Sequence, residues 1–128
     1  MQAYGNAIFG LVAAVGSLVA SGVDASETEI ENQLDTINKH FEAASKDFGG
    51  GFVQLHARKE GSGETEHQIY HFDCANKKYE LLFSNPNEPE SMPALEKDTL
   101  LNPIDPFHAV APLAQHTCTK HGYPLLEW

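Results

Sequence analysis

The two cysteines of the chain, Cys74 and Cys118, constrain its fold more than any other feature. Strand-forming residues lead into Cys74 from Ile69 and resume from Tyr79 to Phe83, so this cysteine is expected at the end of a strand. A disulfide that closes a loop of about 45 residues stabilises a domain by about 4 kcal/mol. The alternative is a pair of reduced thiols buried as small core residues. We expect the disulfide, because the N-terminal sequence favours export to an oxidising compartment.

Residues 1–23 carry no charged side chain, and the run from Ala7 to Ala20 is almost entirely apolar or small. This length suits the core of a signal peptide better than the roughly 20 residues of a comfortable membrane span. Val23-Asp24-Ala25 offers a cleavage site, so residues 1–25 are predicted to be a signal peptide. A retained membrane anchor and a buried helix are the alternatives, because no Lys or Arg precedes the apolar run.

Residues 26–128 are predicted to form a single small α+β domain. The formal net charge is −10, and the eight Lys and Arg residues are scattered along the chain. This charge disfavours binding to nucleic acid and to anionic lipid, whereas a basic protein partner would be attracted. Contact with a membrane is expected only if residues 1–23 are retained.

The start of the domain carries a helical pattern. Ser26 with Glu29, and Thr28 with Glu31, are overlapping capping boxes. Apolar residues then recur at helical spacing, at Ile30, Leu34, Ile37 and Phe41. The pattern predicts an amphipathic helix that begins at Ser26 and ends either near His40 or at Phe48.

Strands are predicted over residues 52–58, 66–74 and 78–83, and the turns between them favour an antiparallel meander. The segment from Ser84 to Pro106 is acidic and rich in proline, so it is predicted to be a long, solvated loop without regular structure.

The last part of the chain is predicted to pack on the sheet. Phe107–Val110 is a candidate strand, and Pro112 suits the start of a short helix that ends at Cys118. The disulfide would tie this helix to the sheet. The apolar segment Tyr123–Trp128 is expected to cover the sheet.

The residues around the cysteines resemble the surface-adhesin protein E family of small exported bacterial proteins. The likeness lies in Phe72–Leu82, with its Asp-Cys and polar turn, and in Val110–Pro112 and Cys118, and it extends weakly to residues 41–45 and 51–55. The chain departs from the family by opening with an acidic helical pattern in place of a Trp-containing strand. The resemblance implies an exported α+β protein with an antiparallel sheet, a disulfide and no catalytic centre. Named members are adhesins that bind host extracellular-matrix and plasma proteins.

The chain has seven histidines, which raises the question of a metal site. His67 and His71 share a face of the predicted strand, and His116, Cys118 and His121 are close in sequence. A metal site needs three or four converging ligands, and a spacing of four along a strand separates two rings too widely for one ion. A disulfide-bonded Cys118 cannot be a ligand. The sequence therefore favours hydrogen-bonded or solvent-facing histidines, with no metal and no cofactor.

Motifs of catalysis are missing from the sequence. It has no Gly-x-Ser-x-Gly motif, no phosphate-binding loop and no paired glutamates, so no enzyme is predicted. Asp73 is interpreted as a turn-forming residue rather than a catalytic acid.

Two functions follow from the sequence. The first is an exported protein-binding module, adhesin-like, whose acidic loop and sheet face meet a protein partner in the periplasm or at the cell surface. The alternative is an accessory or structural subunit of a bacterial envelope complex, anchored in the membrane by residues 1–23.

Overall fold

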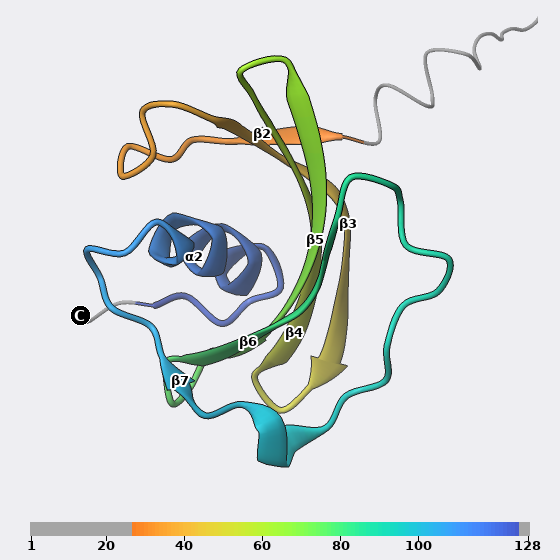
Figure 1. The fold of residues 1–128 in the computed structure, drawn as a ribbon. Coiled ribbons are helices and arrows are strands. Elements are labelled where there is room, and N and C mark those ends of the chain that lie inside the picture. Colours follow the sequence, from red (N-terminus) through yellow and green to blue (C-terminus); the bar gives the residue numbers. More distant parts are fainter. Residues whose placement is uncertain (1–26, 126–128) are drawn as a thin grey trace, which may run out of the picture.

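A computed structural model describes residues 27–125 of the chain (Figure 1). These residues form one six-stranded antiparallel sheet, in which every strand pairs with its neighbours in sequence, and the sheet curves around the helix α2 (Val110–Lys120). The strands are β2 (Thr28–Ile30), β3 (Lys39–Gly49), β4 (Phe52–Gly61), β5 (Glu64–Asp73), β6 (Lys78–Asn85) and β7 (Asn102–Pro103).

The antiparallel meander and the Cys74–Cys118 disulfide are present as predicted. The α+β fold class is wrong, because the described residues form mostly a sheet with one short C-terminal helix. The strands predicted after Gly51 correspond to β4, β5 and β6, which are up to three residues longer at their ends.

The amphipathic helix expected from Ser26 is absent from the described residues, where β2 and β3 are joined by a loop over residues 31–38. In this loop the side chain of Asn32 accepts a hydrogen bond from the N–H of Leu34, and that of Asp35 accepts one from the N–H of Ile37 (both 3.1 Å). Such local bonds from side chain to backbone compete with helix formation. Leu34 and Ile37 are consequently 43% and 75% exposed instead of forming an apolar stripe.

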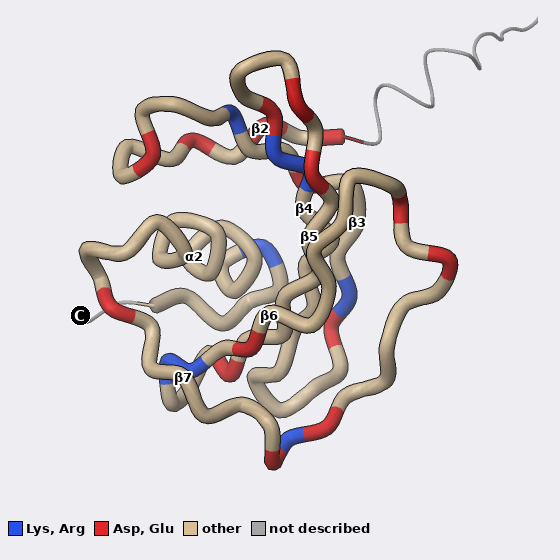
Figure 2. The backbone as a smooth tube through the Cα atoms, in the orientation of Figure 1, with Lys and Arg blue, Asp and Glu red and all other residues tan. Residues whose placement is uncertain are grey.

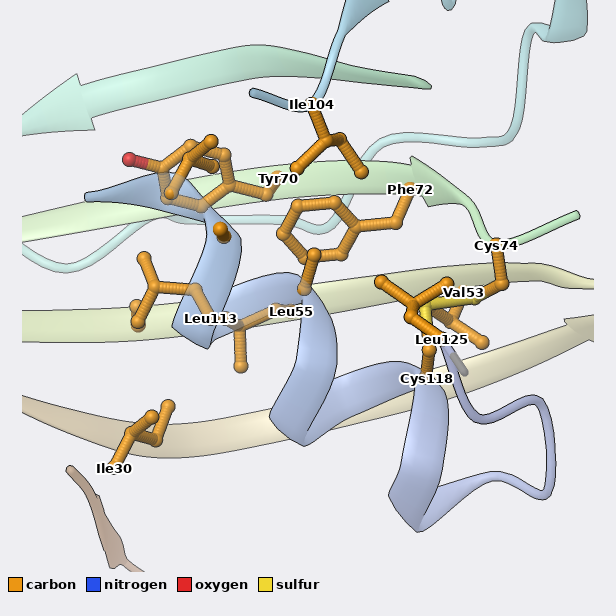
Figure 3. Close-up of a cluster of buried hydrophobic side chains, with 14 residues drawn as sticks. Ile30, Val53, Leu55, Tyr70, Phe72, Cys74, Ile104, Leu113, Cys118 and Leu125 are labelled. Atoms are coloured by element: carbon orange, nitrogen blue, oxygen red, sulfur yellow. A yellow bond between two sulfur atoms is a disulfide. The ribbon is translucent and has the colours of Figure 1, made fainter. Parts of the chain in front are cut away.

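The hydrophobic core lies between the sheet and α2 (Figure 3). Alternate residues of the central strands, among them Leu55 and Phe72, point toward the helix, where they meet Leu113 and its neighbours. Leu125 is also buried in this core, so the C-terminal segment covers the sheet at that residue. Residues 126–128 lie outside the described part of the chain.

The opposite face of the sheet is covered by the proline-rich segment, residues 86–101 (Figure 1). Nε2 of Gln54 donates a hydrogen bond to the carbonyl of Pro93 (2.9 Å), and Nζ of Lys97 lies 4.9 Å from the centre of the Phe52 ring. This segment is irregular as predicted, apart from a short 3₁₀ turn, η2 (Lys97–Thr99).

The segment after β7 differs from the prediction. Phe107–Val110 is not a strand, because the carboxylate of Asp105 accepts a hydrogen bond from the N–H of Phe107 (2.9 Å) and so forms a turn. The helix α2 then begins at Val110 and extends past Cys118 to Lys120.

The disulfide joins the residue that follows β5 to the C-terminal half of α2, with a Cα–Cα distance of 5.9 Å and a sequence separation of 44. Replacing both cysteines by alanine should lower the free energy of unfolding by about 4 kcal/mol, because the unfolded chain regains the entropy of the open loop. Urea unfolding of the oxidised protein and of the Cys74→Ala/Cys118→Ala variant measures this difference. An unchanged unfolding midpoint would contradict it.

Candidate functional site

The outer edge of β3 is the largest stretch of unpaired strand next to the helix. β2 pairs only with residues 40–42 of β3, so within residues 27–125 the segment Ala43–Gly49 has no strand partner on its outer side. Its inner side is held by β4. We call residues 43–49 the free edge. Exposed N–H and C=O groups along such an edge are a template to which a strand of another protein can pair.

The side chains of the free edge decide what it can pair with. Ala44, Lys46 and Asp47 are exposed. Antiparallel pairing of two copies centred on this segment would bring Lys46 opposite Lys46, and like charges at that distance oppose pairing. The free edge is therefore better suited to a strand from a different protein than to a second copy of this chain.

A cavity lies at one end of the free edge. It has a volume of about 310 Å³ and is lined by Gly50, Gly51, Cys74, Ala75, Tyr123 and Pro124. The hydroxyl of Tyr123 donates a hydrogen bond to Asp47 (3.0 Å), which holds the C-terminal segment beside β3. A partner strand that runs along β3 could place a side chain in this cavity.

The inner side of β3 is tied to the C-terminal half of α2. The carboxylate of Glu42 is buried, contacts Nε2 of His116 (2.6 Å) and accepts a hydrogen bond from Nζ of Lys120. Oγ of Ser45 lies 2.9 Å from Nε2 of His121. Burial raises the pKa of Glu42, but the hydrogen bonds from Lys120 and His116 outweigh it and hold this pKa below its ordinary value. These contacts fix β3 in place next to its free edge.

The histidines that the sequence grouped are separated in the structure. His116 and His121 contact different residues of β3, and Cys118 is in the disulfide. Nε2 of His71 lies 2.9 Å from Nε2 of Gln54. No group of three His, Cys, Asp or Glu side chains in residues 27–125 is placed to hold a metal ion.

One histidine contact was missed from the sequence. Nε2 of His56 lies 3.0 Å from Nδ1 of His67, and both rings are buried beneath residues 86–101. Burial and the neighbouring His67 lower the pKa of His56. The signal was available, because the turn at Gly61–Gly63 sets the register of β4 and β5 and so places His56 diagonally across from His67.

Asp73 is a turn residue in the structure. Its carboxylate accepts hydrogen bonds from the backbone N–H of Asn76 (3.1 Å) and from the side-chain amide of the same residue (2.8 Å). The structure thus places Asp73 in the polar connection between β5 and β6. That the chain is not an enzyme stays a prediction.

Comparison of the chain with protein-family models, with curated proteins and with solved structures finds no match. The likeness to the surface-adhesin protein E family therefore stays a prediction. No helix within residues 27–125 has the length and apolar character needed to cross a membrane. The predicted signal peptide or anchor, residues 1–25, lies outside the described residues.

The contacts of Glu42 predict a pH-dependent contribution to stability. A carboxyl whose pKa is lowered on folding stabilises the fold fully above its ordinary pKa of about 4.5, and this stabilisation is lost as the pH falls through the folded value. Glu42→Gln should therefore lower the free energy of unfolding by about 2 kcal/mol at pH 7, and the difference should shrink at low pH.

Urea unfolding between pH 3 and pH 7 measures this dependence. Glu29→Gln, at an exposed position of β2, is the matched control and should change stability little at any pH. Equal effects of the two substitutions would show that the buried contacts of Glu42 do not stabilise the fold.

Proposed function

We propose that this chain is an exported, non-enzymatic protein-binding module, adhesin-like, that pairs a strand of its partner with the free edge of β3. The observation that carries the proposal is the length of β3 that β2 leaves unpaired within the described residues. A partner strand would gain backbone hydrogen bonds along residues 43–49, and side-chain pockets beside the strand would add specificity.

The free edge supports this role better than the surfaces expected from the sequence. We expected a face of the sheet to meet the partner, but α2 covers one face and residues 86–101 cover the other. The edge is the part of the sheet that neither layer covers. Its backbone groups offer affinity without any cofactor or catalytic residue.

The disulfide indicates an oxidising, exported environment. The periplasm or the cell surface is the location that we propose on this basis. The net charge of −10 favours a basic partner, which it would attract over a distance set by the ionic strength. The resemblance to the protein E family supports an extracellular-matrix or plasma protein as that partner.

Export predicts a defined covalent form of the protein in its native cells. The intact mass should correspond to a chain that starts after Ala25 and should be lower by two protons than that of the reduced chain. Mass spectrometry with and without reductant and alkylation measures both features. A full-length mass would support the membrane-anchored subunit instead, and free thiols would contradict export.

Strand pairing predicts that a charge placed on the free edge weakens binding. Ala44→Lys should lower the affinity for a bound extracellular-matrix or plasma protein at least about tenfold, because a second lysine next to Lys46 opposes an incoming strand. Ala94→Lys makes the same substitution at an exposed position of residues 86–101 and should leave binding unchanged.

Surface plasmon resonance against a panel of extracellular-matrix and plasma proteins measures these affinities. Loss of binding in Ala94→Lys with retention in Ala44→Lys would assign the contact to the proline-rich segment and contradict the free edge. Absence of binding to every member of the panel would contradict the proposed partner class.

A further inference from the structure

Three large apolar side chains are exposed at the N-terminal end of α2. Phe107 is 83% exposed, Ile37 is 75% exposed and Leu34 is 43% exposed. They lie on two loops, residues 31–38 and 104–109, and we call these three residues the apolar rim. Exposed apolar groups that gather in one place commonly mark a site of interaction with another protein.

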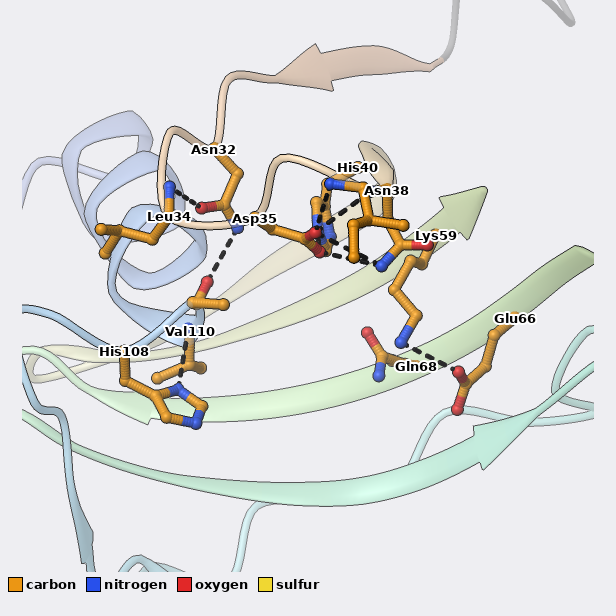
Figure 4. A network of polar contacts seen from close by, with 12 residues as sticks. Asn32, Leu34, Asp35, Asn38, His40, Lys59, Glu66, Gln68, His108 and Val110 are labelled. Carbon is orange, nitrogen blue, oxygen red and sulfur yellow. Dashed lines mark hydrogen bonds and ion pairs between the residues drawn. The ribbon is translucent and has the colours of Figure 1, made fainter. Parts of the chain in front are cut away.

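The two loops are joined to each other by a hydrogen bond. The side-chain amide of Asn32 donates to the carbonyl of Ala109, the residue that precedes α2, over 2.8 Å (Figure 4). Asn32 is two residues from Leu34, and Ala109 is two residues from Phe107. The bond therefore brings segments that are far apart in sequence into one surface.

Each residue of the apolar rim is held by the same local arrangement. The N–H of Leu34 donates to Asn32, that of Ile37 donates to Asp35 and that of Phe107 donates to Asp105, over 3.1, 3.1 and 2.9 Å. Each acceptor lies two residues before its donor, and the side chain that follows points outward. These bonds fix the backbone in advance, which lowers the entropy lost when a partner binds.

The charge around the apolar rim has one sign. The two loops contain Glu31, Asp35 and Asp105 and no Lys or Arg, so red alone marks them in Figure 2. Burial raises the pKa of Asp35, but hydrogen bonds from His40 and Asn38 outweigh it and hold this pKa well below its ordinary value. Asp35 thus stays negative across the physiological range.

From this combination we propose that the apolar rim binds a protein segment in which aromatic or aliphatic side chains are flanked by Lys or Arg. The apolar residues of the partner cover Phe107, Ile37 and Leu34, and its cations meet the carboxylates of Asp105 and Glu31. The negative charge of the loops disfavours an anionic membrane surface as the occupant.

The apolar rim is separate from the free edge of β3. α2 contacts the free edge through His121, at its C-terminal end, and contacts the loop of the apolar rim through Ala109, at its N-terminal end. A helix of 11 residues is about 16 Å long. The proposal therefore goes beyond strand pairing and does not depend on it.

The test uses a library of 12-residue peptides displayed on phage and selected on the immobilised, disulfide-bonded protein. Selected peptides should combine Phe, Leu or Trp with Lys or Arg. A synthetic selected peptide should bind the Ile37→Ser/Phe107→Ser variant at least about tenfold more weakly than the unchanged protein, and its affinity should fall at higher salt.

Two control variants make the result specific. Leu101→Ser removes another highly exposed apolar side chain, 70% exposed, outside the apolar rim, and should leave peptide affinity unchanged. Ala44→Lys alters the free edge and should also leave it unchanged, so failure of this proposal and failure of strand pairing are distinguishable. Because the substituted residues are exposed, unfolding curves of all variants should match within about 0.5 kcal/mol.

Three results would overturn the proposal. They are a selection that yields no binding peptide, selected peptides without basic residues, and peptides that bind the rim variant as well as they bind the unchanged protein. Binding to vesicles of anionic phospholipid that is lost in the Ile37→Ser/Phe107→Ser variant would likewise overturn it and assign the surface to a membrane.

Discussion

The position of α2 on the curved sheet determines the rest of this structure. The disulfide holds the C-terminal half of the helix against the end of β5, and the apolar side of the helix fills the concave face. At its C-terminal end, Lys120 and His116 bind the buried carboxylate of Glu42. At its N-terminal end, Asn32 reaches Ala109. The helix thereby fixes both β3 and the loop that precedes it, and with them the two surfaces to which we assign binding.

The second face of the sheet is built differently. It buries polar side chains, including Gln54, His56 and His71, which would cost free energy without hydrogen-bond partners. The carbonyl of Pro93 supplies one partner from the covering segment. Prolines suit such a cover, because each has a restricted backbone in the unfolded chain and no N–H of its own to satisfy. The proline-rich segment is thus a structural layer, although its sequence resembled that of a free loop.

Local patterns made much of the fold predictable. The strands around Cys74 and the helix that carries Cys118 follow from residues that lie next to each other in sequence. The same kind of pattern failed at Ile30, Leu34, Ile37 and Phe41, whose spacing fits a helix, because Asn32 and Asp35 bind the intervening backbone and turn the chain. Both residue types favour turns, so the competing signal was present in the sequence.

The candidate site was less predictable, because it depends on how far elements run and which elements meet. The free edge exists because β2 ends at Ile30 while β3 continues to Gly49, and nothing local to either strand sets that difference. The apolar rim needs the contact between Asn32 and Ala109, which are 77 residues apart. The contact of His56 with His67 was within reach, because it requires only the register of one hairpin.

The two proposed surfaces differ in what they can recognise. Backbone groups on the free edge accept almost any strand, so they provide affinity with little sequence preference. The apolar rim selects apolar and basic side chains, so it provides specificity. An extended segment of about five residues covers the roughly 16 Å length of α2. One partner chain could therefore occupy both surfaces, and its second contact would form at the high effective concentration set by the first.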